Sequence, residues 1–286
     1  MSPAAEVAAN LAEELDAVPA PEVARMAAHI GARPGVAAVL FYGARRRASE
    51  DRGGPLDFYA LTDGDAAWRG PGLSALACRL LPPNVYAVSL PGDGDAAAID
   101  AKVAVMRLAA FRARMRPGSW DTTLWARFSQ PATLVWARDA AARRAVRDAV
   151  AAAVETAAHW AAHLSPAPQD AAATWRGLHR ATYAAELRVE SAERVAGLFD
   201  RHEARWRKLH ALLIADRASS ADPGAARAFR RRARVGKLLN AARLAKAAFT
   251  YRGGAAYLRN KVARHARRAP LDGSPGPAQP SPARPA

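Results

Sequence analysis

The pattern of apolar and polar positions divides the chain into a strand-rich part and a longer helical part. Apolar residues recur at helical spacing over about residues 4–31, where Pro19 and Pro21 predict a break between two helical pieces. Short apolar runs bounded by turn residues then predict strands. The five predicted strands cover residues 36–42, 56–61, 84–90, 102–108 and 133–137.

From residue 139 onward the pattern is almost wholly helical, and it ends in a tail rich in Pro, Gly and Ser. Helices are expected at about 139–163, 170–199 and 200–217. The sequence therefore predicts an α/β (α+β) fold in which a sheet domain is followed by helices. The predicted divisions are a sheet domain at 1–138, a helical domain at 139–225, a basic amphipathic segment at 226–268 and a disordered tail at 269–286.

Charge narrows the range of partners. The 286 residues include 42 Lys and Arg against 26 Asp and Glu, a formal net charge of +16, which favours nucleic acid, nucleotide phosphates or an anionic membrane. Cys78 is the single cysteine, so an intramolecular disulfide and a thiol zinc cluster are excluded and a reducing cytoplasm is expected. No run reaches the roughly 18–20 apolar residues of a transmembrane helix, so any membrane contact should be peripheral.

Two neighbouring predicted strands carry the candidate chemistry. The first ends in Tyr42-Gly43-Ala44, a small-residue turn that would let backbone N–H groups approach phosphate oxygens. On the next strand Asp57 alternates to the face opposite Leu56, where a carboxylate could hold Mg²⁺ against those phosphates. This arrangement is similar to that of the nucleotidyltransferase superfamily, whose signature is Gly-Ser followed by one or two aspartates.

Three later segments strengthen the resemblance. They are residues 120–131 (WDTTLWARFSQP), 183–195, which contain YAAELR followed by ERV, and 246–264 (KAAFTYRGGAAYLRNKVAR). Together with the two strands, and in the same order over about residues 36–265, they resemble the mitochondrial-type (Tam41-like) family of phosphatidate cytidylyltransferases.

The resemblance implies a nucleotidyltransferase-like sheet domain that transfers a cytidylyl group from CTP to phosphatidic acid, releasing pyrophosphate and forming CDP-diacylglycerol. It also implies Mg²⁺ and a peripheral location on the inner face of the cytoplasmic membrane, with no DNA partner and RNA disfavoured. The residues it assigns are Tyr42, Gly43 and Ala44 for the nucleotide, Asp57 for the metal, and Lys102, Arg127, Glu186 and Arg188 for catalysis.

Some positions depart from the family pattern. Ala44 replaces the usual serine, Tyr59 stands where many members have a second aspartate, and Glu186 stands where the family tends to have aspartate. Because Mg²⁺ needs further ligands, Asp100 is the preferred helper, since it shares a strand face with Lys102.

Asp63 and Asp65 are also considered as metal ligands. The departures leave open a binding protein of the same fold that has lost activity, and the basic charge leaves open a nucleotidyltransferase acting on RNA, although no RNA-binding motif is recognised. The arginine run at 230–234 is either a solvated face or, with the apolar residues after it, part of an interfacial helix on anionic lipid.

Overall fold

The computed structural model describes residues 3–43, 54–68, 71–92, 97–165, 170–186, 192–215 and 223–250. The strands are β1 (Val36–Tyr42), β2 (Leu56–Thr62), β3 (Asn84–Leu90), β4 (Ile99–Arg107) and β5 (Thr133–Ala137). The helices are α1 (Pro3–Leu15), α2 (Pro21–Gly31), α4 (Leu73–Leu80), α5 (Leu108–Arg114), α6 (Thr122–Phe128), α7 (Ala140–Leu164), α8 (Ala171–Ala184), α9 (Ala192–Asp200), α10 (Glu203–Leu213) and α11 (Pro223–Thr250).

The five strands form one mixed sheet in the order β3-β4-β2-β1-β5. β1 is antiparallel to both β2 and β5, β3 is antiparallel to β4, and β2 is parallel to β4. The predicted α/β class is therefore confirmed. The ends of β1 and β2 that carry the candidate residues are neighbours in the middle of this sheet.

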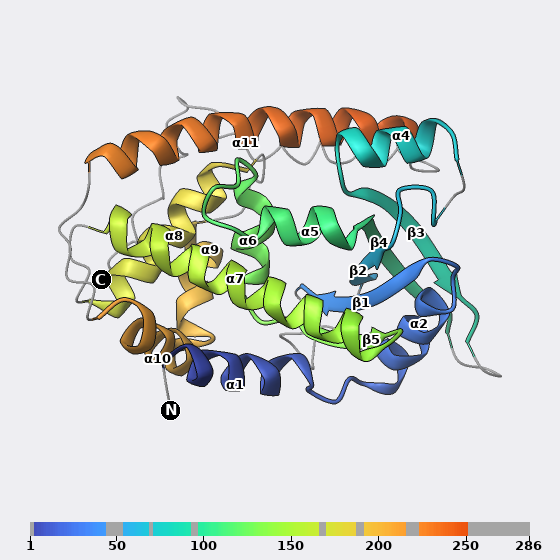
Figure 1. Cartoon of the computed structure of the whole chain (residues 1–286), viewed down its shortest axis with the longest axis horizontal. Helices are drawn as coiled ribbons and strands as arrows, with labels where there is room; N and C mark the ends of the chain where they lie inside the picture. Colours follow the sequence, from blue (N-terminus) through green and yellow to red (C-terminus); the bar gives the residue numbers. More distant parts are fainter. Residues whose placement is uncertain are drawn as a thin grey trace, which may run out of the picture.

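The central strands β1 and β2 are buried on both faces, which explains why they are nearly continuous apolar runs. Phe58 of β2 and Val103 of β4 face α2, where they join Met26 in one core. Tyr59 of β2 belongs to the second, larger core, which lies under α1, α5, α6 and α7 and extends to α10 (Figure 1). The alternation predicted for β2 is thus observed, and Asp57 lies on the face of the larger core.

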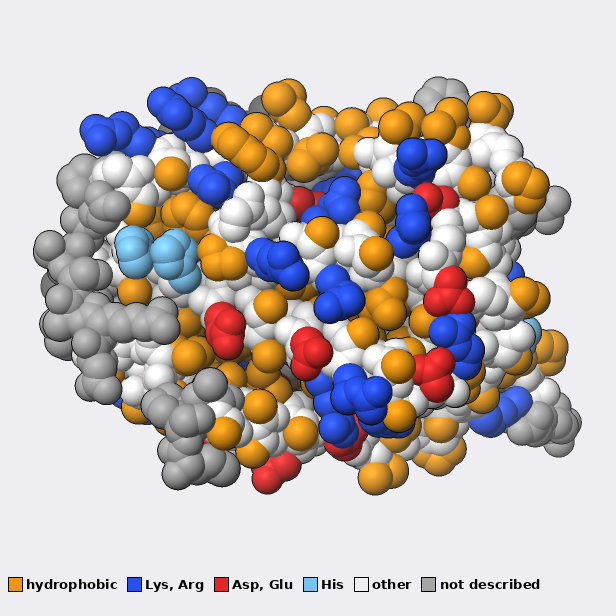
Figure 2. Space-filling view, in the orientation of Figure 1, with side chains coloured by type: hydrophobic (Ala, Val, Ile, Leu, Met, Phe, Trp, Pro, Cys, Tyr) orange, Lys and Arg blue, Asp and Glu red, His pale blue; other side chains and the backbone are white. Residues whose placement is uncertain are grey.

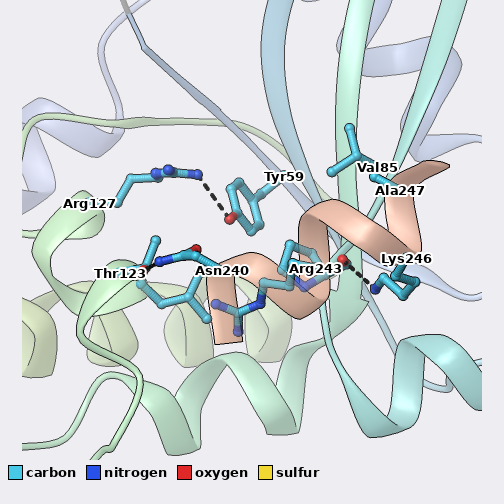
Figure 3. A pocket seen from close by; sticks show the side chains of 10 residues that line it. Tyr59, Val85, Thr123, Arg127, Asn240, Arg243, Lys246 and Ala247 are labelled. Carbon is cyan, nitrogen blue, oxygen red and sulfur yellow. Dashed lines mark hydrogen bonds between the residues drawn. The ribbon is translucent and has the colours of Figure 1, made fainter. Parts of the chain in front are cut away.

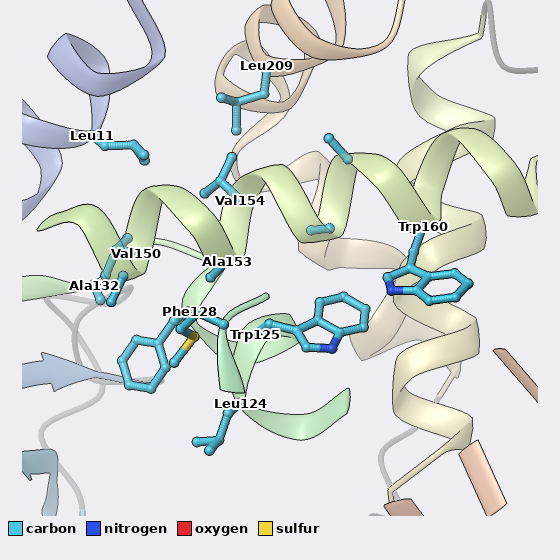
Figure 4. Close-up of a cluster of buried hydrophobic side chains, with 14 of the residues drawn as sticks. Leu11, Leu124, Trp125, Phe128, Ala132, Val150, Ala153, Val154, Trp160 and Leu209 are labelled. Carbon is cyan, nitrogen blue, oxygen red and sulfur yellow. The ribbon is translucent and has the colours of Figure 1, made fainter. Parts of the chain in front are cut away.

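Helix α6 joins the sheet to the helical part of the molecule. Trp125 and Phe128 are fully buried and pack toward α7, where Val150 and Val154 meet them (Figure 4). The helix begins at Asp121, whose carboxylate accepts a hydrogen bond from the backbone N–H of Thr123, as a good N-cap does. With its apolar residues held in the core, α6 presents Arg127 to the sheet.

The structure corrects several element predictions. β4 begins at Ile99 rather than 102, and the single helix expected over 170–199 is two helices, α8 and α9. Three short helices, α4, α5 and α6, were not predicted, because seven or eight residues give too few turns for a periodic signal. No helix in the described ranges combines the length and apolarity that crossing a bilayer requires.

Helix α11 is a long rod along one edge of the molecule (Figure 1). Phe229 is 4% exposed and meets Trp160 of α7 at a ring-centroid distance of 5.4 Å. Farther along, Gly236 is buried, and the Asn240 amide donates to the Thr123 hydroxyl at 3.2 Å. The inner face of α11 therefore packs on the body of the protein. The part of the predicted segment beyond residue 250 lies outside the described residues.

Candidate functional site

A row of three side chains crosses the middle of the sheet at the end where β2 begins. Tyr42 of β1 is paired with Asp57 of β2, and Asp57 is paired with Lys102 of β4. Paired residues of neighbouring strands project to the same face, and neighbouring strands are about 4.8 Å apart. The sheet thus brings together a phenol, a carboxylate and an ammonium group, although Tyr42 and Lys102 are 60 positions apart in the sequence.

Gly43 closes this row on the β1 side. Its φ is +95°, which favours glycine, and a side chain there would begin 2.8 Å from Oδ2 of Asp57. The backbone of the turn therefore approaches the Asp57 carboxylate closely only because residue 43 has no side chain. Approach of this turn to phosphate oxygens, as the sequence predicts, stays a prediction, and Ala44 lies outside the described residues.

Arg127 projects from α6 over the same face of the sheet. Its Nη1 donates to the Tyr59 hydroxyl at 3.2 Å, and its guanidinium carbon is 5.3 Å from the centre of the Tyr42 ring. Arginine stays protonated in proteins, and both neighbours are neutral as phenols. A cation is therefore held over the row by uncharged partners, and Glu186 lies close enough to interact with it electrostatically.

Burial controls the protonation of the two tyrosines. It raises the pKa of both Tyr42 and Tyr59 above the ordinary value, although the nearby Arg127 cation opposes the shift. The rings pack on Phe128, with centroid distances of 5.9 Å to Tyr42 and 5.0 Å to Tyr59. Both hydroxyls therefore remain protonated at neutral pH, as hydrogen-bonding groups rather than bases.

A cavity of about 150 Å³ lies beside Arg127, between β2, β3, α6 and α11. Tyr59 and Arg127 line one part of it, and Arg243 and Lys246 of α11 line another (Figure 3). Sequence reasoning did not identify Arg243 or Lys246 as cavity residues. Their charge was the only signal in the sequence, because the groups that position them are more than 120 residues away along the chain.

Arg243 and Lys246 are already engaged with the protein. Arg243 forms an ion pair with the buried Asp121 carboxylate and donates from Nε to the Pro82 carbonyl at 2.8 Å. Lys246 donates to the carbonyl oxygens of Leu81 and Pro83 and to the Asn84 side chain. Burial lowers the pKa of Lys246 to about 8. These cations hold α11 over the cavity.

The remaining predicted residues lie in different places. Glu186 follows α8 and is half-buried, whereas Arg188 lies outside the described residues. Asp100 is exposed, pairs with Ser89 of β3, and lies two residues along β4 from Lys102 on the same face.

The other two considered aspartates lie beyond the opposite end of β2 from Asp57. Asp63 pairs with Arg138, and Asp65 lies 3.5 Å from Arg107. Residues six apart in an extended chain are about 20 Å apart, so neither carboxylate shares the end of the sheet that Asp57 occupies.

The side chains around Asp57 determine how the expected Mg²⁺ could be coordinated. Among the described residues no cluster of three or more His, Cys, Asp or Glu side chains could enclose a metal ion. The described residues therefore do not form a complete metal coordination sphere from protein side chains alone. Mg²⁺ is commonly held by one or two carboxylates together with substrate phosphates and water, and Asp57 beside the Gly43 turn fits that shared mode.

No protein-family model matches the chain, and no curated protein matches it either. The family resemblance therefore rests on the residues and segments of the sequence itself, and the geometry of the site must carry any functional proposal.

Proposed function

We propose that the protein is a nucleotidyltransferase that transfers a cytidylyl group from CTP to phosphatidic acid at a membrane surface. The observation that carries the proposal is the row of Tyr42, Asp57 and Lys102 beneath Arg127, with the Gly43 backbone against the carboxylate. A carboxylate, two cations and an open glycine turn on one face of a sheet suit a substrate that carries several phosphates.

In the proposed reaction, a phosphate oxygen of the acceptor forms a bond to the α-phosphorus of CTP, and the bond to the departing pyrophosphate breaks. Negative charge accumulates on the oxygens around the α-phosphorus and on the leaving group. Arg127 and Lys102 would stabilise that charge, because fixed cations need no rearrangement during the reaction. The neutral Tyr42 and Tyr59 hold Arg127 without cancelling its charge.

Asp57 would hold Mg²⁺ jointly with the phosphates of the nucleotide. When bound, the ion would neutralise phosphate charge and orient the leaving group. Asp100 stays a candidate second carboxylate. It projects to the same face of β4 as Lys102, and its exposed side chain leaves it free to approach a nucleotide-bound ion.

The proposal is tested by incubating the purified chain with Mg²⁺, vesicles containing phosphatidic acid, and radiolabelled CTP, ATP or GTP, followed by lipid extraction. Label in the lipid phase with CTP alone is the expected result. Transfer of label to added RNA instead would favour the RNA alternative suggested by the basic charge.

Two variants locate the activity. Asp57→Asn should abolish transfer while leaving the unfolding midpoint nearly unchanged, because the amide keeps the shape but loses the charge that binds the ion. Asp148→Asn is the matched control, since Asp148 is exposed on α7. If Asp57→Asn turned over like the native chain at saturating Mg²⁺, the site would be wrongly assigned.

A further inference from the structure

Helix α4 turns its leucines away from the protein. Leu73, Leu76 and Leu80 are 85%, 50% and 71% exposed, and their spacing places them on one stripe of the helix. The opposite side of α4 is anchored, since Cys78 is buried and its Sγ contacts the Val105 carbonyl at 3.4 Å. An aligned row of exposed leucines on a firmly held helix indicates a binding surface.

The segment after α4 is fastened to α11. Lys246 donates to the Leu81 and Pro83 carbonyls, and Arg243 donates to Pro82. The leucine stripe and the outer face of α11 consequently belong to one edge of the molecule. Figure 2 shows basic side chains toward one end of this upper edge and hydrophobic side chains along the rest of it, over α11 and α4.

The outer face of α11 is strongly positive. The helix has 28 residues and no Asp or Glu. Leu238 is 71% exposed on it. The exposed basic residues of α11 are Arg227, Arg230, Arg231, Arg234 and Lys237. Helix α4 adds the exposed Arg79 and carries no acidic residue either.

We infer that the α4 leucine stripe and the outer face of α11 form one docking surface for an anionic lipid bilayer, with the leucines entering the interface and the basic residues meeting headgroups. Charge and apolarity together select this occupant. Nucleic acid would match the charge but would leave the leucines exposed. A second copy of the chain would cover the leucines but bring two positive surfaces together.

The docking surface and the cavity lie on opposite sides of α11. The inner side of α11 lines the cavity with Arg243, Lys246 and Ala247, while its outer side would face lipid. One helix, about 10 Å across, would then separate the cavity from the bilayer. The choice of lipid partner rests on the proposed function, but docking itself is measured without any turnover.

The test is flotation of the full chain with phosphatidylcholine vesicles, alone or containing phosphatidic acid or phosphatidylglycerol. The native chain should bind both anionic vesicles equally and the neutral ones far more weakly. Binding to phosphatidic acid vesicles alone would overturn the inference, because it would indicate recognition of one headgroup rather than a charged surface.

Variants separate the two parts of the surface. The triple change Leu73→Ala, Leu76→Ala and Leu80→Ala should weaken binding on the order of 100-fold at both low and high salt, since it removes apolar contact. The pair Arg230→Gln and Arg234→Gln should weaken binding on the order of 30-fold at low salt, with the difference shrinking as salt rises.

Matched controls are Val18→Ala, a 95% exposed apolar residue between α1 and α2, and Arg144→Gln with Arg180→Gln on α7 and α8. Unchanged binding of the leucine variant would remove α4 from the surface. Dissociation of a dimer by the same variant in ultracentrifugation, without loss of vesicle binding, would identify a second copy as the occupant. Vesicle binding without nucleotide transfer would refute the proposed function while leaving the docking surface intact.

Discussion

The ion pair between Asp121 and Arg243 offers the sharpest test of how α11 is held over the cavity. Both side chains are largely buried, at 5% and 13% exposure, and Asp121 also caps α6. We predict that Arg243→Met, which keeps much of the side-chain length, destabilises the protein. The change would leave the Asp121 carboxylate with the Thr123 N–H at 3.2 Å and the more distant Arg114 Nε at 3.6 Å.

The expected magnitude follows from these contacts. Removing one partner of a buried ion pair costs about 3–5 kcal/mol, because a charge remains buried without its partner. Arg114 retains part of the compensation, and the bond from Arg243 to the Pro82 carbonyl is lost as well. We therefore expect a loss of about 3 kcal/mol in the free energy of unfolding.

Urea unfolding followed by circular dichroism measures this loss. The control is Glu203→Gln in α10, whose partner Arg207 is 2.7 Å away and whose pair is about half exposed, so a loss under about 0.5 kcal/mol is expected. A double-mutant cycle with Asp121→Asn isolates the coupling between the two side chains. A loss below about 1 kcal/mol for Arg243→Met would show that the pair does not hold α11 in place.

Three further predictions concern the site and the core. Gly43→Ala should lower transfer activity severely and destabilise the fold by about 1–2 kcal/mol, because the new methyl group meets the Asp57 carboxylate and residue 43 has a positive φ. Activity equal to that of the native chain would refute the close approach. Arg127→Lys should raise the KM for CTP and lower kcat, since a lysine cannot reproduce paired donors to phosphate; unchanged kinetics would exclude Arg127 from phosphate binding. Burial lowers the pKa of His179 to about 3, so between pH 6.5 and 3 the unfolded chain binds more protons than the folded chain. The free energy of unfolding therefore falls as the pH drops through that window, with a slope of up to ~1.4 kcal/mol per pH unit. His179→Phe should flatten that slope in urea titrations at several pH values, and an unchanged slope would point to other groups.

The sequence predicted the sheet well because buried strands leave a strong local signal. The alternation in β2 placed Asp57 and Tyr59 on one face and Phe58 on the other, as observed. The turn at Gly43 was also readable, since a glycine at the end of a strand is a local feature. These elements depend on neighbouring residues, which a single sequence displays directly.

The cavity could not be predicted in the same way. Its far wall is formed by Arg243 and Lys246. Their hydrogen-bonding partners Pro82 and Pro83, in the segment before β3, are about 160 positions away. The basic residues of α11 looked alike in sequence, yet Arg243 turns inward and Arg234 outward. That choice depends on the packing of α11 against α6 and β3, a tertiary contact that helical periodicity alone does not encode.

Tyr59 affects the charge of the site because it places a neutral side chain beside Arg127. An aspartate at this position, which is 1% exposed beside Arg127, would form an ion pair with the guanidinium. Such a pair would cancel the Arg127 charge and leave the carboxylates to bind metal. Tyr59 is instead uncharged and accepts one hydrogen bond from Arg127. The side chain at position 59 therefore does not compensate the guanidinium charge, although Glu186 interacts with it electrostatically. In the proposed reaction Arg127 would therefore contribute to neutralising the phosphates of the nucleotide.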